Sequence, residues 1–479
     1  MNLKKVINYI GNIFILEAIL MLFPFFVSIL YKEPNGKYFI YVAFLIFIFG
    51  IILRHIYNSD KKFFSAEGFV TASLSWIILS IVGALPFYFS GEIPNLLDAI
   101  FETVSGFTTT GATILNNPAN LSRCMNFWRC LTHFIGGMGV LVLMLAIINS
   151  KGDMMQIMKA ESPGPQVGKL LPKVSDTAKV LYIIYILLTL ITIVSYYFSG
   201  MPIFDSICIG LGTAGTGGFV VTSGGCSDYP VISQILIAIF MLLFGVNFNI
   251  YYFIILKKIK IALMSEELRV YFFIVVISIV AIMINIGSIF ANVFDTFVNA
   301  FFHVSSIITT TGFSIYDYTT WPLFSQCILL VLMLIGGCAG STAGGFKVSR
   351  LIITFKYAYN EIYYQLHPNT VKAIKFEDKV VSNETKRTIV SYTIIYMLII
   401  LISVLIISLE NFDFATTVSS VFETFNNIGL GISKIGPKGN FSIFSDLSKV
   451  VFIILMLTGR LEIFPILMLF SRKTWSRKS

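Results

Sequence analysis

The sequence predicts an all-α polytopic membrane protein that contains four repeated units. Three observations lead to this prediction. The first is a series of long apolar runs in a chain of 479 residues that is 56% hydrophobic and only 12% charged, with a mean hydropathy of +0.84. The second is a short stretch of glycine and hydroxyl residues that recurs along the chain. The third is the clustering of lysine and arginine in alternate connecting segments.

Ten segments are long and apolar enough to be considered for crossing a bilayer, which takes about 20 apolar residues in a helix. Because backbone groups in hydrocarbon must be satisfied internally, we expect each of them to be an α-helix. Only three contain an acidic, basic or histidine side chain: Glu17 in the first, His133 in the fourth, and Arg460 with Glu462 in the last. In chain order the segments are 6–31, 38–53, 68–91, 130–150, 180–204, 229–256, 270–294, 318–346, 388–409 and 450–471.

Basic residues predict that both termini face the cytoplasm, because cytoplasmic loops carry the excess of lysine and arginine. With that orientation, 26 of the 34 basic residues fall in the inner segments 1–5, 54–65, 150–179, 257–269, 347–387 and 472–479. The net charge of +9 is therefore a signal of membrane topology. No basic arm or stripe indicates binding to nucleic acid.

The sequence contains none of the residue patterns that would indicate an enzyme or a metal site. The six cysteines form no CxxC pair, and no His/Cys cluster has the spacing of metal ligands. The apolar runs contain no pair of catalytic carboxylates and no nucleophile triad. We therefore expect a protein that is not an enzyme and holds no cofactor, with the cysteines as small apolar packing residues.

A short motif recurs four times. TTTGAT at 108–113 returns as TTTGFS at 309–314, with weaker copies GTGGFV at 215–220 and NNIGLG at 426–431. The glycines in register are separated by 107, 94 and 117 residues; they are Gly111, Gly218, Gly312 and Gly429. Each copy follows an apolar segment too short to cross a bilayer. These short segments are 96–107, 204–214, 298–308 and 415–425.

The repeated unit thus consists of a span, a short helix, a small-residue loop and a second span. Four such units follow two extra N-terminal helices, which gives ten transmembrane helices and four re-entrant pore helices in a pseudo-fourfold arrangement. We expect the two extra helices in 1–60. The four membrane–pore–membrane repeats are expected at 61–150, 151–258, 259–360 and 361–479.

A loop at membrane depth is tolerated only where it is buried in protein or lines a watery cavity. Four loops around one axis can replace the hydration shell of a cation with backbone carbonyls, and glycine permits the backbone conformations this needs. A single copy would be better explained as a helix-terminating turn with a glycine cap; four copies in one topological position favour a selectivity filter. The residues predicted to form this filter and bind the cation are Thr109, Thr110, Gly111, Thr216, Gly217, Gly218, Thr310, Thr311, Gly312, Asn427, Ile428 and Gly429.

Together these segments resemble the Trk/Ktr/HKT superfamily of potassium transporters over essentially the whole chain. The two extra N-terminal helices favour its TrkH/TrkG branch. The resemblance rests on FETVSGFTTTGAT (101–113), HFIGGMG (133–139), TAGTGGF (213–219), TTTGFS (309–314), GGCAGSTAGGFKVSR (336–350), NNIGLG (426–431) and GRLEIFP (459–465).

The resemblance implies potassium uptake across a bacterial inner membrane by a homodimer with one pore per protomer. It also implies a cytosolic nucleotide-binding RCK-type subunit, called TrkA in Trk systems. We expect the basic segments 150–179 and 347–387 to form part of its docking surface; attraction to lipid headgroups is the alternative. In plant HKT relatives a serine in place of the first filter glycine goes with Na⁺ preference, so four glycines here favour K⁺.

The segment GGCAGSTAGGF, 336–346, interrupts a predicted span. Its glycines are Gly336, Gly337, Gly340, Gly344 and Gly345. A helix loses about 1 kcal/mol for each glycine relative to alanine, so we expect the helix to break here. Close helix packing through small residues is the alternative, and a phosphate-binding P-loop is excluded because no lysine directly follows Gly345. The resemblance implies a flexible loop that obstructs the pore below the filter.

Arg460 lies within the last predicted span. An arginine at mid-bilayer costs about 3 kcal/mol unless it faces a cavity or a partner. An arginine that snorkels to the membrane surface from a helix end is the alternative. The resemblance implies that Arg460 projects toward the pore below the filter, where its charge opposes the passage of cations.

Several acidic residues fall on the predicted outer side or in the predicted pore helices. A ring of carboxylates would concentrate cations at the pore mouth, although solvation or helix capping explains any single one. They are Glu92, Asp98, Glu102, Asp205, Asp228, Asp295, Asp317, Asp413 and Glu423.

Three other functions are compatible with a polytopic membrane protein. A Na⁺-permeable relative stays open, as does coupling of K⁺ uptake to H⁺, to Na⁺ or to the potential alone. An unrelated secondary transporter would lack the four pore loops. An intramembrane protease would need paired aspartates or a Ser/His arrangement within the spans, and the sequence has neither there.

Overall fold

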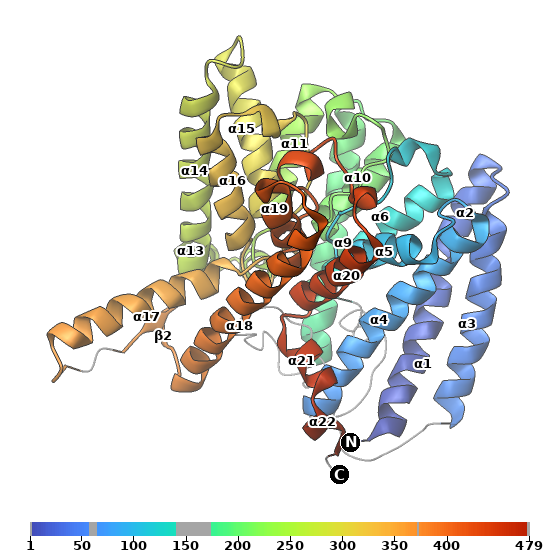
Figure 1. Ribbon diagram of the computed structural model, residues 1–479, viewed down its shortest axis with the longest axis horizontal. Helices are drawn as coiled ribbons and strands as arrows, with labels where there is room; N and C mark the ends of the chain where they lie inside the picture. The colour runs from blue at the N-terminus through green and yellow to red at the C-terminus, as the bar shows by residue number, and fades with distance from the viewer. Residues whose placement is uncertain (1, 57–64, 140–173, 371–372, 477–479) are drawn as a thin grey trace.

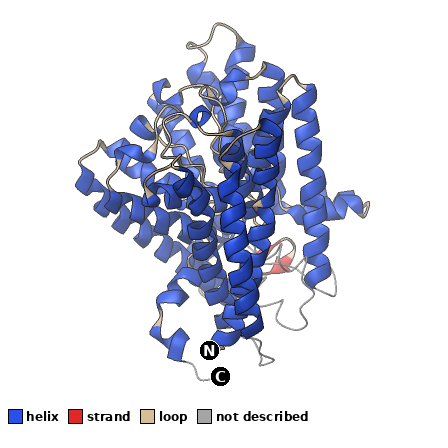
Figure 2. Ribbon diagram, turned by 90° about the vertical axis from the view of Figure 1, so that its right-hand side faces the viewer, coloured by secondary structure: helices blue, strands red, loops and turns tan. Residues whose placement is uncertain are grey.

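The structure is a computed structural model that describes residues 2–56, 65–139, 174–370 and 373–476. Helices dominate the described chain, with one small hairpin of two strands (Figure 2). The end of the fourth predicted span and most of the basic segment 150–179 lie outside these residues, as do the unit boundaries predicted at 60 and 150.

Three helices precede the repeated units. They are α1 (Leu3–Leu20), α2 (Leu22–Tyr31) and α3 (Gly36–Ile56). Helices α1 and α2 together form one apolar element of 29 residues, and α1 packs along α3. At this contact a Cβ atom on Gly11 or on Gly50 would lie 2.8 Å from the other residue's carbonyl oxygen. Small residues thus allow the two backbones to approach closely, as in other membrane helix pairs.

Each predicted unit begins with a long helix, and a short helix follows it. The long helices are α4 (Ser65–Ser90), α9 (Val174–Phe198), α14 (Glu266–Ile286) and α18 (Asn383–Ile407). The short helices are α5 (Leu96–Phe107), α10 (Ile203–Gly215), α15 (Val293–Ile308) and α19 (Phe414–Phe425). The four segments predicted as short helices are thereby confirmed as helices.

After its short helix, each unit continues in the described residues with a helix that ends early or is broken. These elements are α6 (Arg123–Gly137), α11 (Val231–Phe244) with α12 (Phe248–Ile255), α16 (Leu323–Ile335) with α17 (Val348–Leu366), and α20 (Asp446–Arg460) with α21 (Phe464–Phe470). The other α-helices of the described residues are α13 (Ile259–Met264) and α22 (Arg472–Ser476). Strands β1 (Lys375–Phe376) and β2 (Lys379–Val380) form the hairpin between α17 and α18.

Because these helices are short or broken, helix length alone identifies fewer membrane spans than the ten that the sequence predicts. Six helices of the described residues are long and apolar enough to cross a membrane, and the bent pair α11 and α12 would make a seventh. The apolar run 229–256 was predicted as one span but is two helices that meet at 90°. The prediction of ten spans stays a prediction.

Contacts between units follow a cyclic order. Helix α10 packs against α6 of the preceding unit, α15 against α11, and α19 against α16. Helix α5 of the first unit packs against α20 of the last unit, which closes the cycle. The short helices therefore lie between successive units, and α17 extends outward from the bundle (Figure 1).

Candidate functional site

The four recurring loops share one backbone conformation. Thr109, Thr216, Thr310 and Asn427 have φ of 56°, 53°, 54° and 56°, in the left-handed region that side-chain-bearing residues rarely adopt. Two residues later, the glycines in register have φ of 81°, 83°, 82° and 76°; they are Gly111, Gly218, Gly312 and Gly429. Nearly equal φ values at matching positions of four loops that differ in sequence indicate that the surroundings impose this conformation.

These four glycines form a closed ring of contacts between the loops. A Cβ atom on any of them would lie less than 3.0 Å from a carbonyl oxygen of the next loop. The contacts pair Gly111 with Gly217, Gly218 with Thr311, Gly312 with Ile428, and Gly429 with Thr110. Because the fourth loop returns to the first, the loops surround a common centre. Glycine is required at these positions by both the positive φ and the close approach.

We call these four glycines and their contacts the glycine ring. A cavity of about 370 Å³ lies next to the glycine ring. All four of its glycines line the cavity, together with polar residues such as Thr113 and Asn116. The other eight residues predicted to bind K⁺ lie in the same four loops and are buried. The structure thus brings together all twelve predicted residues. Backbone carbonyls are the kind of oxygen ligand that can replace the hydration shell of a cation.

Hydroxyl groups in the first and third loops bond to the protein. Thr108 and Thr110 hydroxyls lie 2.8 Å apart, and Thr309 and Thr311 hydroxyls lie 2.7 Å apart. The Asn427 amide donates to the Thr110 hydroxyl over 2.9 Å, so it links the fourth loop to the first. These threonine hydroxyls therefore hold the loops in place.

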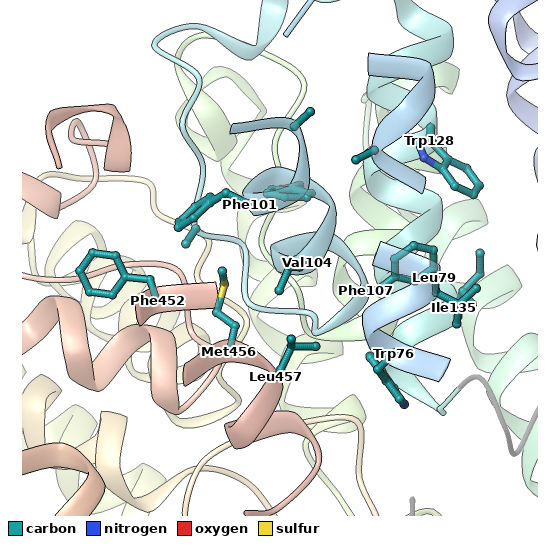
Figure 3. Close-up of a cluster of buried hydrophobic side chains, with 14 of the residues drawn as sticks. Trp76, Leu79, Phe101, Val104, Phe107, Trp128, Ile135, Phe452, Met456 and Leu457 are labelled. Atoms are coloured by element: carbon teal, nitrogen blue, oxygen red, sulfur yellow. The ribbon is translucent and has the colours of Figure 1, made fainter. Parts of the chain in front are cut away.

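Apolar packing fixes the short helix of the first unit (Figure 3). Phe101, Val104 and Phe107 of α5 are buried among side chains of three other helices. Those neighbours include Trp76 and Leu79 of α4, Trp128 and Ile135 of α6, and Met456 and Leu457 of α20. Helix α5 is therefore packed against three other helices, which fixes the position of the loop that follows it.

Arg129 and Glu102 form a buried ion pair beside the first two loops. The Arg129 Nη2 lies 2.7 Å from Glu102 Oε1, and Nη1 donates to the Val220 carbonyl over 3.2 Å. The Glu102 carboxylate also accepts from the Thr113 hydroxyl and the Ile114 amide. Sequence reasoning missed this pair, although a charged residue at the start of an apolar run was a signal.

The outer acidic residues do not form a ring around the cavity. Of the nine predicted, Asp317 alone lines the cavity in the described residues. Others have separate partners: Asp98 pairs with Lys449 at 2.6 Å, and Asp413 caps α19 through the Thr416 amide at 3.0 Å. Helix capping, one of the two alternatives considered, explains Asp413, whereas Asp98 has an ion-pair partner that was not predicted.

The glycine-rich segment breaks the helix as predicted. Helix α16 ends at Ile335, Gly336 has φ of 73°, and α17 begins at Val348. The intervening segment 336–346, called here the intramembrane loop, contacts the ring loops directly. The Gly344 amide donates to the Thr310 hydroxyl over 2.6 Å. The loop therefore lies against the third ring loop.

Arg460 is brought to this loop by the end of α20. Its Nη1 donates to the Thr342 carbonyl over 2.8 Å, and its Nη2 donates to the carbonyls of Gly136 over 2.6 Å and Gly137 over 2.5 Å. Arg460 therefore connects the intramembrane loop to the end of α6. The neighbouring Glu462 pairs with Arg350 of α17 instead.

Glu267 holds the other side of the intramembrane loop. Its Oε1 accepts from the Ala339 amide over 2.7 Å and from the Ser349 amide over 3.1 Å. The side chain is 4% exposed. Sequence reasoning missed this residue because it stands at the start of α14, where a carboxylate is ordinary helix capping.

No group of three His, Cys, Asp or Glu side chains in the described part of the chain could hold a metal ion. All six cysteines are free, and only Cys327 is exposed. The oxygen-rich ring is therefore the principal candidate site.

Comparisons with known proteins point in one direction. A family profile described as "TrkH: Cation transport protein" matches residues 36–479. The chain is 36% identical over 485 residues to the Trk system potassium uptake protein TrkH of Salmonella typhimurium, covering 99% of this chain and 100% of that protein. It is 33% identical to TrkG of Escherichia coli, covering 99% of both chains.

A solved structure is also similar over the whole length. The crystal structure of the potassium transporter TrkH from Vibrio parahaemolyticus superposes with a TM-score of 0.89 at 29% sequence identity. The match covers 99% of this chain and 100% of that chain.

Proposed function

The chain belongs to the TrkH family of cation transport proteins, and from this premise we propose that it takes up potassium ions across the bacterial inner membrane through the glycine ring. The observation that carries the proposal is the closed cycle of contacts from Gly111 to Gly429. A ring of backbone carbonyls can replace the hydration shell of K⁺ at little cost, because its dipoles are already oriented. The apolar helices identify a membrane protein.

The predicted units supply the frame for this proposal. In it, residues 61–150, 151–258, 259–360 and 361–479 are four membrane–pore–membrane repeats around a pseudo-fourfold axis, and 1–60 adds two helices. The cyclic packing of each short helix on the preceding unit supports this arrangement. Both termini face the cytoplasm, as the distribution of basic residues favours.

A purified protein in a lipid bilayer tests the proposal. With K⁺ on one side and Na⁺ on the other, we expect a reversal potential that favours K⁺. Equal permeability to the two ions would contradict a K⁺ filter, and an absence of current together with an absence of ⁸⁶Rb⁺ flux would contradict transport itself.

We assign gating to the intramembrane loop and Arg460. The loop carries Gly336, Gly337, Gly340, Gly344 and Gly345 and bonds to the third ring loop through Gly344 and Thr310. The glycines make the loop adaptable, because each lowers helical stability by about 1 kcal/mol. Arg460 supports the closed arrangement by bonding to Thr342 and adds a positive charge that opposes cations.

Two assemblies complete the proposal. One is a homodimer with one pore per protomer, and the other is a complex with a cytosolic RCK-type regulatory subunit of the TrkA kind. Segment 347–387 contains eight basic residues and includes α17, which extends from the bundle. Reversing the charges of its exposed basic residues should abolish capture of the regulatory subunit; undiminished capture would leave lipid headgroups as their partner. Cross-linking in native membranes tests the dimer.

A further inference from the structure

The four ring loops are supported in different ways. Threonine pairs support the first and third loops, and the Asn427 amide supports the fourth, where it donates to the Met456 carbonyl over 2.9 Å. The second loop has Gly217 where the first and third have Thr110 and Thr311. It therefore has no side chain of its own at this position.

The imidazole of His133 occupies that space. A Cβ atom on Gly217 would lie less than 3.0 Å from three atoms of the His133 ring, namely Cγ, Nδ1 and Cδ2. The φ of Gly217 is outside the left-handed region, so the imidazole is the obstacle to a side chain there. His133 is fully buried in α6, which belongs to the preceding unit.

Hydrogen bonds fix both nitrogens of this imidazole. Nε2 accepts from the Phe219 amide over 3.3 Å, and Nδ1 lies 2.8 Å from the Gly106 carbonyl. Because a nitrogen that accepts carries no proton, Nδ1 carries it and donates to Gly106. One neutral side chain thus connects the short helix of the first unit to the residue that follows Gly218.

Phe219 also contacts a second residue of α6, Arg129. Its aromatic ring lies 4.1 Å from the His133 ring and 4.0 Å from the Arg129 guanidinium. Arg129 and His133 are four residues apart and therefore lie on one face of the helix. Arg129 additionally donates to the Val220 carbonyl. The two residues hold the backbone that leaves Gly218.

We propose that His133 is a positioning residue for ion selectivity, which replaces the missing side chain of the second ring loop and fixes its carbonyls. This inference rests on the proposed filter. It names a specificity-determining residue outside the four loops. Two contacts carry this role: the imidazole fills the space beside Gly217, and Nε2 accepts from the amide of Phe219, the residue next to Gly218.

The test measures K⁺/Na⁺ permeability ratios from reversal potentials of purified, monodisperse variants. His133→Ala should lower the ratio about fivefold, the effect of losing about one net hydrogen bond, which is a shift of about 40 mV at 59 mV per tenfold. Gly217→Thr should also lower it, because threonine overlaps the imidazole. The double variant should recover the ratio to within about twofold of wild type, since the new side chain then fills the space.

A matched control is His303→Ala. His303 is also fully buried, but its nitrogens lie near the carbonyls of Asn299 and Tyr316. Its removal should reduce stability and leave the ratio unchanged. A folded His133→Ala variant with the wild-type ratio would overturn the inference, as would a double variant no better than the single ones.

Amide substitutions keep the inference testable if His133→Ala does not fold. Glutamine can place an acceptor near the position of Nε2, and asparagine can place a donor near Nδ1. His133→Gln should therefore retain more selectivity than His133→Asn, and equal ratios would contradict the role of the Phe219 contact. Gly312→Ser separates the two proposals: if it leaves the ratio unchanged, the filter itself fails. If it lowers the ratio and His133→Ala does not, only the inference fails.

Discussion

Replacing Arg460 with alanine should increase K⁺ flux. In the structure its guanidinium bonds to Thr342 of the intramembrane loop and to Gly136 and Gly137 of α6. Of these three bonds, only the one to Thr342 holds the loop. Truncation therefore frees the loop from α20 and removes a positive charge from its neighbourhood.

The expected magnitude follows from these contacts. A hydrogen bond to a charged group contributes about 1.5–3 kcal/mol, so losing the Thr342 bond shifts the closed–open equilibrium about 10- to 150-fold. The charge acts in the same direction, because two unit charges about 6 Å apart repel by about 3 kcal/mol at an effective dielectric of 20. Arg460 is partly exposed, so solvent reduces this second contribution.

The assay is ⁸⁶Rb⁺ uptake into proteoliposomes that contain equal amounts of folded protein. Two variants separate the causes. Arg460→Lys keeps the charge but loses the planar fork that reaches Thr342 and α6 together, whereas Arg460→Gln loses the charge. If the tether dominates, both should increase uptake; if charge dominates, only glutamine should. Folded Arg460→Ala protein with wild-type uptake would refute a gating role for Arg460.

Two further predictions concern buried carboxylates. Glu267→Gln should increase ⁸⁶Rb⁺ uptake severalfold, because neutral acceptors hold the Ala339 and Ser349 amides less strongly than a carboxylate does. Glu266→Gln is the control, since its partner Lys356 lies outside the loop; equal effects of the two substitutions would argue against the Glu267 contact. Arg129→Met should destabilise the protein by about 3–5 kcal/mol, because it strands the buried charge of Glu102. Thermal unfolding in detergent measures this, and an unchanged melting temperature would contradict it.

Local patterns in the sequence predicted the elements that carry the site. The four glycines in register proved to share a backbone conformation, and the segments before them are helices. The helix break at Gly336 also followed from local composition. These features depend on residues close together in the chain, so one sequence suffices to find them.

Contacts between distant residues could not be predicted in this way. Glu102 and Arg129 are 27 residues apart, and Glu267 reaches an amide 72 residues away. The space beside Gly217 is filled by His133 of another unit, which no local pattern reveals. The break between α11 and α12 lies in an uncharged run. Its local signals are Gly245, which directly follows α11, and Asn247, which caps α12 through the Asn249 amide over 3.0 Å.

The central claim is that the glycine ring selects K⁺. It is tested most directly by the K⁺/Na⁺ permeability ratio of Gly312→Ser, measured beside Gly91→Ser. Both glycines have positive φ, of 82° and 76°, but a Cβ atom on Gly312 would collide with the Ile428 carbonyl, whereas one on Gly91 would meet nothing within 4 Å. A perturbation of about 1.4 kcal/mol in the K⁺-bound ring lowers the ratio about tenfold. We predict such a loss for Gly312→Ser and the wild-type ratio for Gly91→Ser; an unchanged ratio in folded Gly312→Ser protein would contradict the account.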